Sequence, residues 1–171
     1  MFYHSVVKEN YLSRWFDKVS LDPSVKNAWV CFLNGDFEKG HLWLDPLVNK
    51  KHPISLVVSS FYSKPGENEE NFYRRHIEQL MEACSLGDPV SEYCLAVYLE
   101  IGDFFEADAD KSRELYKSSS SKGFPPAEFI VGTMLLYGTG GEGQNIDKGF
   151  ELLKNASDQG VAEATELLNN P

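Results

Sequence analysis

The segment DKGFELLKNASDQGVAEA (residues 147–164) decides the fold, because recognisable copies of it precede it at a fixed distance along the chain. The copy DKSRELYKSSSSKGFPPAE (residues 110–128) lies 37 residues upstream, and RHIEQLMEACSLGDPVSE (residues 75–92) lies a further 36 residues upstream. A period of this length is typical of helical repeat proteins, in which each repeat packs on its neighbours. The closing glycines of the three copies keep the register; they are Gly87, Gly123 and Gly160.

A fainter fourth copy reads EKGHLWL (residues 38–44) and is followed by HPISLV (residues 52–57). It lacks the closing glycine and contains Pro46 instead. The same basic position marks all four copies, at Lys39, Arg75, Lys111 and Lys148. Four copies are enough for a solenoid, so we predict an all-α protein of about four stacked antiparallel helix pairs.

Each repeat is predicted to hold two helices. In the first helix, over residues 147–159, one stripe at helical spacing is formed by Phe150, Leu153 and either Ala156 or Ser157. Asp110 and Asp147 are predicted to cap the starts of two such helices by accepting backbone hydrogen bonds. The closing glycines suit the left-handed conformation that ends a helix.

The second helices are predicted over residues 89–101, 125–137 and 161–168. Two of them begin at a proline, which is well tolerated in the opening turn because its missing N–H has no helical partner there. Small residues, Ala96 and Gly132, would let neighbouring helices approach closely. The helical spacing of the aromatic residues predicts that they lie in the core; they are Tyr93, Tyr98, Phe129 and Phe150.

These residues resemble the Sel-one-like repeat family, relatives of the tetratricopeptide repeats. The family pattern has Leu-Gly-x-x-Tyr-x-x-Gly-x-Gly, an Asp-x-x-Lys-Ala segment, an aromatic residue, a small pair and a closing glycine. The chain matches it with Val131, Gly132, Leu135, Gly138, Gly140, Asp147, Lys148, Gly149, Phe150, Ala156, Ser157 and Gly160. The preceding repeat matches with Leu95, Ala96, Leu99, Gly102, Asp110, Lys111, Ser112, Ser118, Ser119 and Gly123. Leucines replace the family's tyrosines, and the glycine loop at 138–143 is longer.

The resemblance covers residues 74–168, and the period extends it to residues 25–73. It implies a right-handed superhelix of antiparallel helix pairs that holds other proteins on a concave surface. We therefore expect one continuous solenoid: an N-terminal capping helix at 1–24, degenerate repeats at 25–73 and Sel-one-like repeats at 74–171. In the capping helix, Tyr11, Trp15 and Val19 would face inward, whereas Lys8, Arg14 and Lys18 would face water.

The composition of the chain argues against several classes of protein. The 171 residues are 42% hydrophobic and 25% charged, as in a globular protein. No apolar run reaches the roughly 18 residues of a membrane-spanning helix, and the N-terminus lacks a signal-peptide pattern. Three cysteines without a paired motif, Cys31, Cys84 and Cys94, favour a reducing cytoplasm. A net charge of -10 opposes direct binding to nucleic acid, whose phosphates need basic residues.

The negative charge is concentrated in one segment. Residues 67–110 carry 12 acids and 2 bases, whereas residues 1–66 are net positive. A concentrated negative field attracts a basic partner. We therefore predict a non-enzymatic binding protein, of the kind of a bacterial immunity protein that neutralises a basic toxin such as a nuclease. The predicted partner-binding residues are Glu67, Glu69, Glu70, Glu100, Asp103, Glu106, Asp108 and Asp110.

Two other functions stay open. A signalling or secretion adaptor would bind a peptide in the concave groove, and an enzyme would use a carboxylate pair in the acidic segment. The motifs for cofactor or metal chemistry are incomplete. The glycine loop at 138–143 lacks the Gly-Lys-Ser/Thr of a phosphate-binding loop, residues 103–114 lack the glycine of a calcium loop, and the four histidines lack metal-ligand spacing. We expect no cofactor and no metal.

Overall fold

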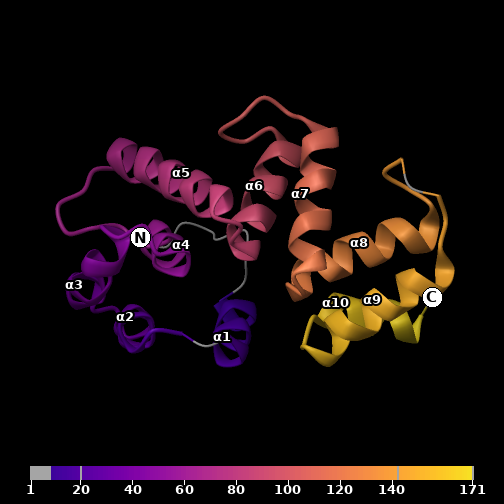
Figure 1. Cartoon of the computed structure of the whole chain (residues 1–171), viewed down its shortest axis with the longest axis horizontal. Coiled ribbons are helices and arrows are strands. Elements are labelled where there is room, and N and C mark those ends of the chain that lie inside the picture. Colours follow the sequence, from indigo (N-terminus) through magenta and orange to yellow (C-terminus); the bar gives the residue numbers. More distant parts are fainter. Residues whose placement is uncertain (1–8, 20, 142, 171) are drawn as a thin grey trace. The chain divides into compact units, whose positions relative to one another are not determined.

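The computed structural model describes residues 9–19, 21–141 and 143–170. In these ranges all regular structure is α-helical and forms ten helices (Figure 1). They are α1 (Glu9–Lys18), α2 (Pro23–Leu33), α3 (Phe37–Val48), α4 (Pro53–Ser60), α5 (Glu69–Ser85), α6 (Pro89–Ile101), α7 (Ala109–Ser121), α8 (Pro125–Tyr137), α9 (Ile146–Asp158) and α10 (Ala162–Asn169).

The last eight helices alternate as first and second helices of the predicted repeats. The second helices α4, α6, α8 and α10 begin at residues 53, 89, 125 and 162, which are 36, 36 and 37 residues apart. Predicted bounds of 89–101 and 125–137 match those of α6 and α8, and α10 begins one residue later than predicted. The fold is therefore the predicted all-α solenoid of helix pairs.

Contacts divide the described chain into two compact units, each of which is considered by itself. Unit 1 contains residues 16–91, and unit 2 contains residues 9–15 and 92–170. The division of the chain at residues 24 and 73 stays a prediction. In α1, Tyr11 is buried and Arg14 and Lys18 are exposed as predicted, whereas Trp15 and Val19 are only half-buried. The capping role of this helix stays a prediction. Lys8 lies outside the described residues.

The helix starts differ from the prediction by two residues. Asp108 and Asn145 cap α7 and α9, not Asp110 and Asp147. Asp108 accepts the amide hydrogen of the third helical residue at 2.9 Å, and Asn145 does so at 3.1 Å. An N-cap side chain needs this spacing to reach an unpaired amide. The predicted caps lie in the first helical turn, where a carboxylate still favours the positive end of the helix dipole.

The helix ends follow the prediction. Gly123 and Gly160 adopt φ angles of 77° and 92°, in the left-handed region that favours glycine. Pro89 and Pro125 are the first residues of α6 and α8. Local chemistry thus sets where each helix begins and ends, and packing sets which face is buried.

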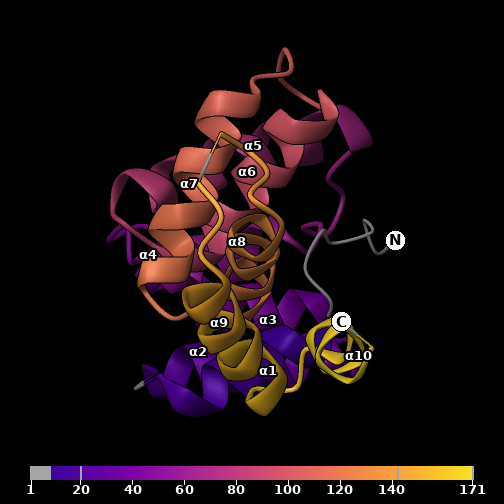
Figure 2. The same cartoon turned by 90° about the vertical axis from the view of Figure 1, so that its right-hand side faces the viewer.

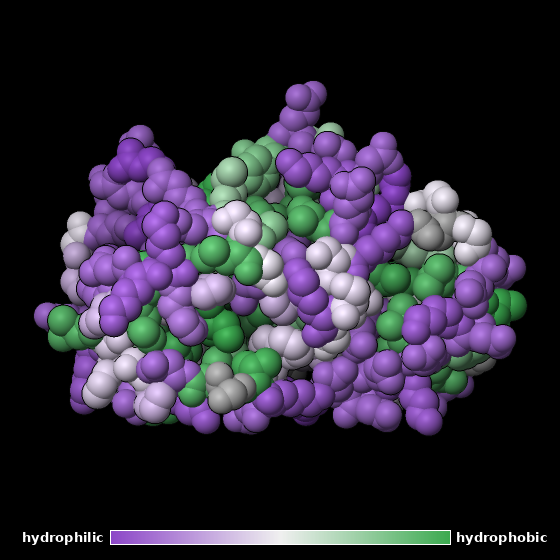
Figure 3. All heavy atoms as spheres, viewed as in Figure 1, coloured by the Kyte–Doolittle hydropathy of each residue, from purple (hydrophilic) through white to green (hydrophobic). Residues whose placement is uncertain are grey.

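Aromatic side chains form much of the core of unit 2. Tyr98, Tyr116 and Phe124 are fully buried, and the ring of Tyr93 lies 5.5 Å from that of Phe124, edge to face. The prediction for Tyr98 is confirmed, whereas that for Phe150 is wrong, because Phe150 is 37% exposed. Hydrophobic side chains accordingly reach the surface over α8 and α9 (Figure 3).

The contact between α8 and α9 explains why Phe150 is exposed. The buried stripe of α9 consists of Gly149, Leu152, Leu153 and Ala156. A Cβ atom on Gly149 would lie 2.9 Å from the backbone nitrogen of Leu136 and 3.0 Å from the carbonyl oxygen of Gly132. The two helices therefore meet backbone to backbone at these glycines. Because Gly149 faces α8, the adjacent Phe150 is turned toward solvent.

We expect the Gly149→Val substitution to destabilise the protein by about 2 kcal/mol, because overpacking a tight contact costs roughly 1–3 kcal/mol. The branched side chain would meet the backbone of α8, which cannot move as easily as a side chain. Urea unfolding followed by circular dichroism measures the effect. Gly143→Ala is the matched control, since nothing lies within 4 Å of a Cβ atom at that position. Equal midpoints for both variants would contradict the close contact.

Candidate protein-binding surface

The connection between α6 and α7, together with the end of α6 and the start of α7, carries five of the eight predicted partner-binding residues. We call residues 100–110 the acidic loop; its carboxylates belong to Glu100, Asp103, Glu106, Asp108 and Asp110. All five residues are exposed. The structure thus places them together at the surface of unit 2.

Backbone hydrogen bonds hold the acidic loop in a defined conformation. The amides of Gly102 and Asp103 both donate to the carbonyl of Tyr98 at 3.0 Å, and Asp108 donates to the carbonyl of Leu99 at 3.0 Å. Phe104 adopts a φ angle of 61°, which is costly for a residue with a side chain. Its ring packs edge to face on Tyr98, with 5.0 Å between the centroids. The carboxylates are therefore displayed on an ordered scaffold.

Some carboxylates of the acidic loop have partners within unit 2. Glu100 accepts a hydrogen bond of 2.7 Å from the hydroxyl of Tyr116. Burial raises the pKa of Tyr116, and the bond to the Glu100 carboxylate raises it further. Asp110 contacts the guanidinium of Arg113, three residues later on α7, and Asp108 is the cap of that helix. Asp103 and Glu106 extend the negative surface between these groups.

The sequence analysis did not identify Tyr116 or Arg113 as neighbours of the acidic loop. The spacing of three residues between Asp110 and Arg113 is a helical signal that could have indicated their contact. No local signal links Glu100 to Tyr116, which are 16 residues apart. Their contact depends on the packing of α6 against the next helix.

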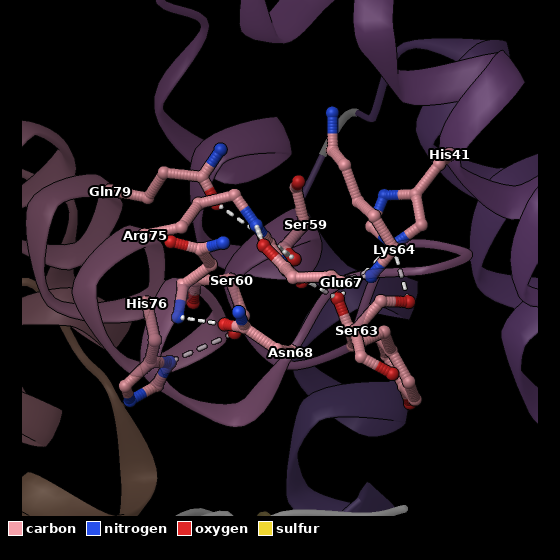
Figure 4. A network of polar contacts seen from close by, with 12 residues as sticks. His41, Ser59, Ser60, Ser63, Lys64, Glu67, Asn68, Arg75, His76 and Gln79 are labelled. Carbon is pink, nitrogen blue, oxygen red and sulfur yellow. Dashed lines mark hydrogen bonds and ion pairs between the residues drawn. The ribbon is translucent and has the colours of Figure 1, made fainter.

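The other three predicted residues, Glu67, Glu69 and Glu70, lie in unit 1. Glu69 and Glu70 are exposed in the first turn of α5, where Glu69 accepts a 2.7 Å hydrogen bond from the hydroxyl of Tyr73. The side chain of Glu67 is only 10% exposed and forms a bidentate ion pair with Arg75 (Figure 4). Glu67 therefore contributes little free negative charge to the surface.

Arg75 is the centre of the polar network around Glu67. Its Nε and Nη2 atoms each lie 2.7 Å from a carboxylate oxygen of Glu67. Nη1 donates to the carbonyl of Ser59 at 2.7 Å and to the side-chain oxygen of Gln79 at 3.0 Å. Nη2 also donates to the carbonyl of Tyr62 at 2.9 Å. Arg75 thus ties the 61–68 loop to α4 and α5, which is a structural role.

The pKa of Glu67 reflects this environment. Burial alone would raise it, but hydrogen bonds from Arg75 and from the backbone amide of Lys64, together with the Arg75 charge, lower it. The carboxylate is therefore ionised and compensated. The two acidic groups lie in different units, so a single acidic edge formed by both of them stays a prediction.

Metal binding and membrane insertion would be indicated by clustered ligand side chains and by long apolar helices. Among the residues that the structure describes, no group of three or more His, Cys, Asp or Glu side chains is arranged to hold a metal ion. Within the same ranges, no helix has the length and apolar character needed to cross a membrane. His41 and His76 are buried, and each contacts a backbone carbonyl of the segment 60–63.

Comparison with known proteins shows which family the repeats match. The Sel1 repeat family matches residues 89–124 and residues 125–161. No curated protein matches the sequence significantly. Thirteen chains among the solved structures do match significantly.

Two solved structures show the fold relationship. A Sel1 repeat protein from Oxalobacter formigenes superposes with a TM-score of 0.64 at 21% identity, covering 75% of this chain and 96% of that one. The protein c5321, a protective antigen of uropathogenic Escherichia coli strains with an SLR fold, superposes with a TM-score of 0.64 at 15% identity. That match covers 95% of this chain, which spans 35% of c5321.

Proposed function

We propose that this protein binds a basic protein partner through its acidic loop. Residues 89–161 match the Sel1 repeat family, a family of non-catalytic scaffolds that generally mediate protein–protein interaction, and this match supports the proposal. The observation that carries the proposal is the display of five exposed carboxylates along residues 100–110, from the end of α6 through the connection to the start of α7. The exposed ring of Phe104 lies within the same loop and offers an apolar contact at its centre.

Electrostatics support this choice of partner. The chain has a net charge of -10, and residues 67–110 contain 12 acids and 2 bases. A negative field of this kind accelerates association with a positive surface and suppresses binding to acidic proteins. In the finer form of the proposal, the chain is a cytoplasmic bacterial immunity protein that covers the active surface of a basic toxin, such as a nuclease.

The test uses the full chain as bait in native lysate. The acidic-loop variant carries Asp103→Asn, Glu106→Gln, Asp108→Asn and Asp110→Asn. Asparagine at position 108 still caps α7, so the fold is retained. We expect the wild-type bait to recover a partner of net positive charge. Its affinity should fall with rising salt and should fall at least about tenfold for the acidic-loop variant, since such charge pairs govern association.

A second variant tests whether binding depends on the charge of the acidic loop or on the net charge of the chain. The charge-matched control carries Asp17→Asn, Glu38→Gln, Glu78→Gln and Asp158→Asn, four exposed positions outside the loop. It has the same net charge as the acidic-loop variant and should bind like the wild type. Equal affinity of the two variants, or an acidic partner, would contradict the proposal. A partner whose catalytic activity survives complex formation would exclude the immunity role and favour an adaptor.

A further inference from the structure

Unit 2 contains a second surface that the acidic loop does not include. A groove of about 410 Å³ lies between α8 and α10. Phe129, Thr133 and Tyr137 line it from α8, and Glu163, Glu166 and Leu167 line it from α10. The α8 residues are spaced by four and the α10 residues by three and one, so each set lies on one helical face. We call this feature the α8–α10 groove.

The α8–α10 groove is open because its two helices pack on α9 through other faces. Gly132 and Leu136 of α8 are buried, as is Ala164 of α10, whereas Tyr137 is 52% exposed. Figure 2 shows α10 end-on beside α9, in the view that faces this part of unit 2. Phe129 and Thr133 are half-buried beside the exposed Tyr137, and an accessible apolar patch with polar groups at its rim is typical of an interaction site.

Side chains of α1 contact unit 2 next to the groove, and these contacts show which types of side chain bind there. The Tyr11 hydroxyl donates a 2.7 Å hydrogen bond to Oε2 of Glu163, and the Trp15 ring packs edge to face on Phe124 at 5.5 Å. Nη1 of Arg14 donates to the carbonyl of Gln159 at 3.3 Å. A helix segment with aromatic and basic side chains therefore already docks here. Glu163 belongs both to this contact and to the lining of the groove.

The negative charge of the groove favours a positively charged ligand. Glu166 is exposed and lies three residues from Glu163 on the same face of α10. Among the described residues, no Lys or Arg lines the groove, and the apolar part of the lining includes two aromatic rings, from Phe129 and Tyr137. An arginine side chain fits both features, because its guanidinium binds carboxylates through two hydrogen bonds and also stacks on aromatic rings.

From this geometry we propose that the α8–α10 groove binds a peptide segment of a partner protein that carries an arginine next to an apolar side chain. The guanidinium pairs with Glu166, and the apolar side chain lies on Tyr137 and Leu167. This contact is separate from the acidic loop and does not depend on it. It gives the chain a second point of attachment, which raises the overall affinity for a partner that reaches both.

The experiment uses a phage library of random twelve-residue peptides, selected on the immobilised full-length chain. We expect enrichment of sequences in which arginine stands beside an aromatic or aliphatic residue. The enriched peptide is then synthesised with a fluorescent label and titrated by fluorescence polarisation. Glu166→Gln and Tyr137→Ala should each weaken binding about tenfold, the size expected for losing one charge-assisted hydrogen bond or one aromatic contact.

Two controls make the result decisive. Glu151→Gln removes an exposed carboxylate of α9 that pairs with Lys148, and it should leave peptide affinity unchanged. The acidic-loop variant should also bind the peptide normally, which separates this inference from the proposed function. Failure to enrich any sequence over blank support, enrichment of acidic peptides, or wild-type affinity in both groove variants would overturn the inference.

Discussion

Replacing Arg75 by alanine is expected to lower the free energy of unfolding by about 3 to 5 kcal/mol, the cost of breaking a buried ion pair by removing one partner. The substitution leaves the Glu67 carboxylate, 10% exposed, without its guanidinium. It also removes the donor for the carbonyls of Ser59 and Tyr62. A loss of this size is a large fraction of the stability of a typical domain. Urea unfolding at pH 7 measures it.

The neighbouring Arg74 provides the matched control. Arg74 is exposed, and its guanidinium donates a hydrogen bond to the Asn71 side chain on the same helix. Arg74→Ala removes the same positive charge and should change the free energy of unfolding by less than about 0.5 kcal/mol, as usual for surface positions. Equal effects of the two substitutions would show that the Arg75 network does not stabilise unit 1.

A second substitution tests whether an uncompensated charge causes the loss. In the Arg75→Ala background, Glu67→Gln removes the stranded charge and should restore about 1 kcal/mol or more, since an unpaired buried charge costs more than a neutral amide. Alone, Glu67→Gln should destabilise the protein because Arg75 then loses its anion. A double mutant with the sum of both single losses would contradict this coupling.

The repeat period made most of the fold predictable from the sequence. Glycine and proline set the helix ends through backbone geometry, which is local, so the bounds of α6 and α8 were correct. The rotation of α9 was not predictable in the same way. Phe150 follows the apolar spacing, but the glycine contact with α8 fixes which face is buried. That contact is made between two helices and has no separate signal in either one.

In the candidate surfaces too, the sequence predicts features that depend on neighbouring residues better than features that depend on distant contacts. The exposure of Asp103 and Glu106 follows from their place in a short polar connection. Glu67 adds little charge to the surface because it pairs with Arg75, eight residues later. The two side chains meet only because the 61–68 loop folds back onto α5. The stripe containing Phe129 and Tyr137 has the spacing of a core face. Spacing alone does not distinguish a buried stripe from the lining of an open groove.

Mild acid is expected to destabilise unit 1 through His76. Burial lowers the pKa of this histidine to about 4 from the ordinary value of 6.5, and the nearby charge of Arg75 acts in the same direction. The carbonyl of Ser60, 2.9 Å from Nδ1, raises it and only partly offsets the burial. The rings of Phe61 and Phe72 surround the imidazole and exclude water from it.

The direction of the pH effect follows from the lowered pKa. The unfolded chain binds a proton at His76 near pH 6.5, whereas the folded chain does so only near pH 4. The stabilisation is therefore complete above pH 6.5 and is lost as the pH falls from 6.5 toward 4. Between pH 7 and pH 5 the expected loss is about 2 kcal/mol from this group alone.

The measurement compares urea unfolding at pH 7 and pH 5 for the wild type and for His76→Asn. The asparagine amide can donate to the Ser60 carbonyl as Nδ1 does, and it does not titrate in this range. The variant is less stable at pH 7 because it leaves a small cavity, so the test lies in the difference between the two pH values. Burial also lowers the pKa of His41, and that contribution is common to both proteins. We expect the variant to lose about 2 kcal/mol less than the wild type between the two pH values. An identical loss in both proteins would show that His76 does not titrate differently in the folded and unfolded states.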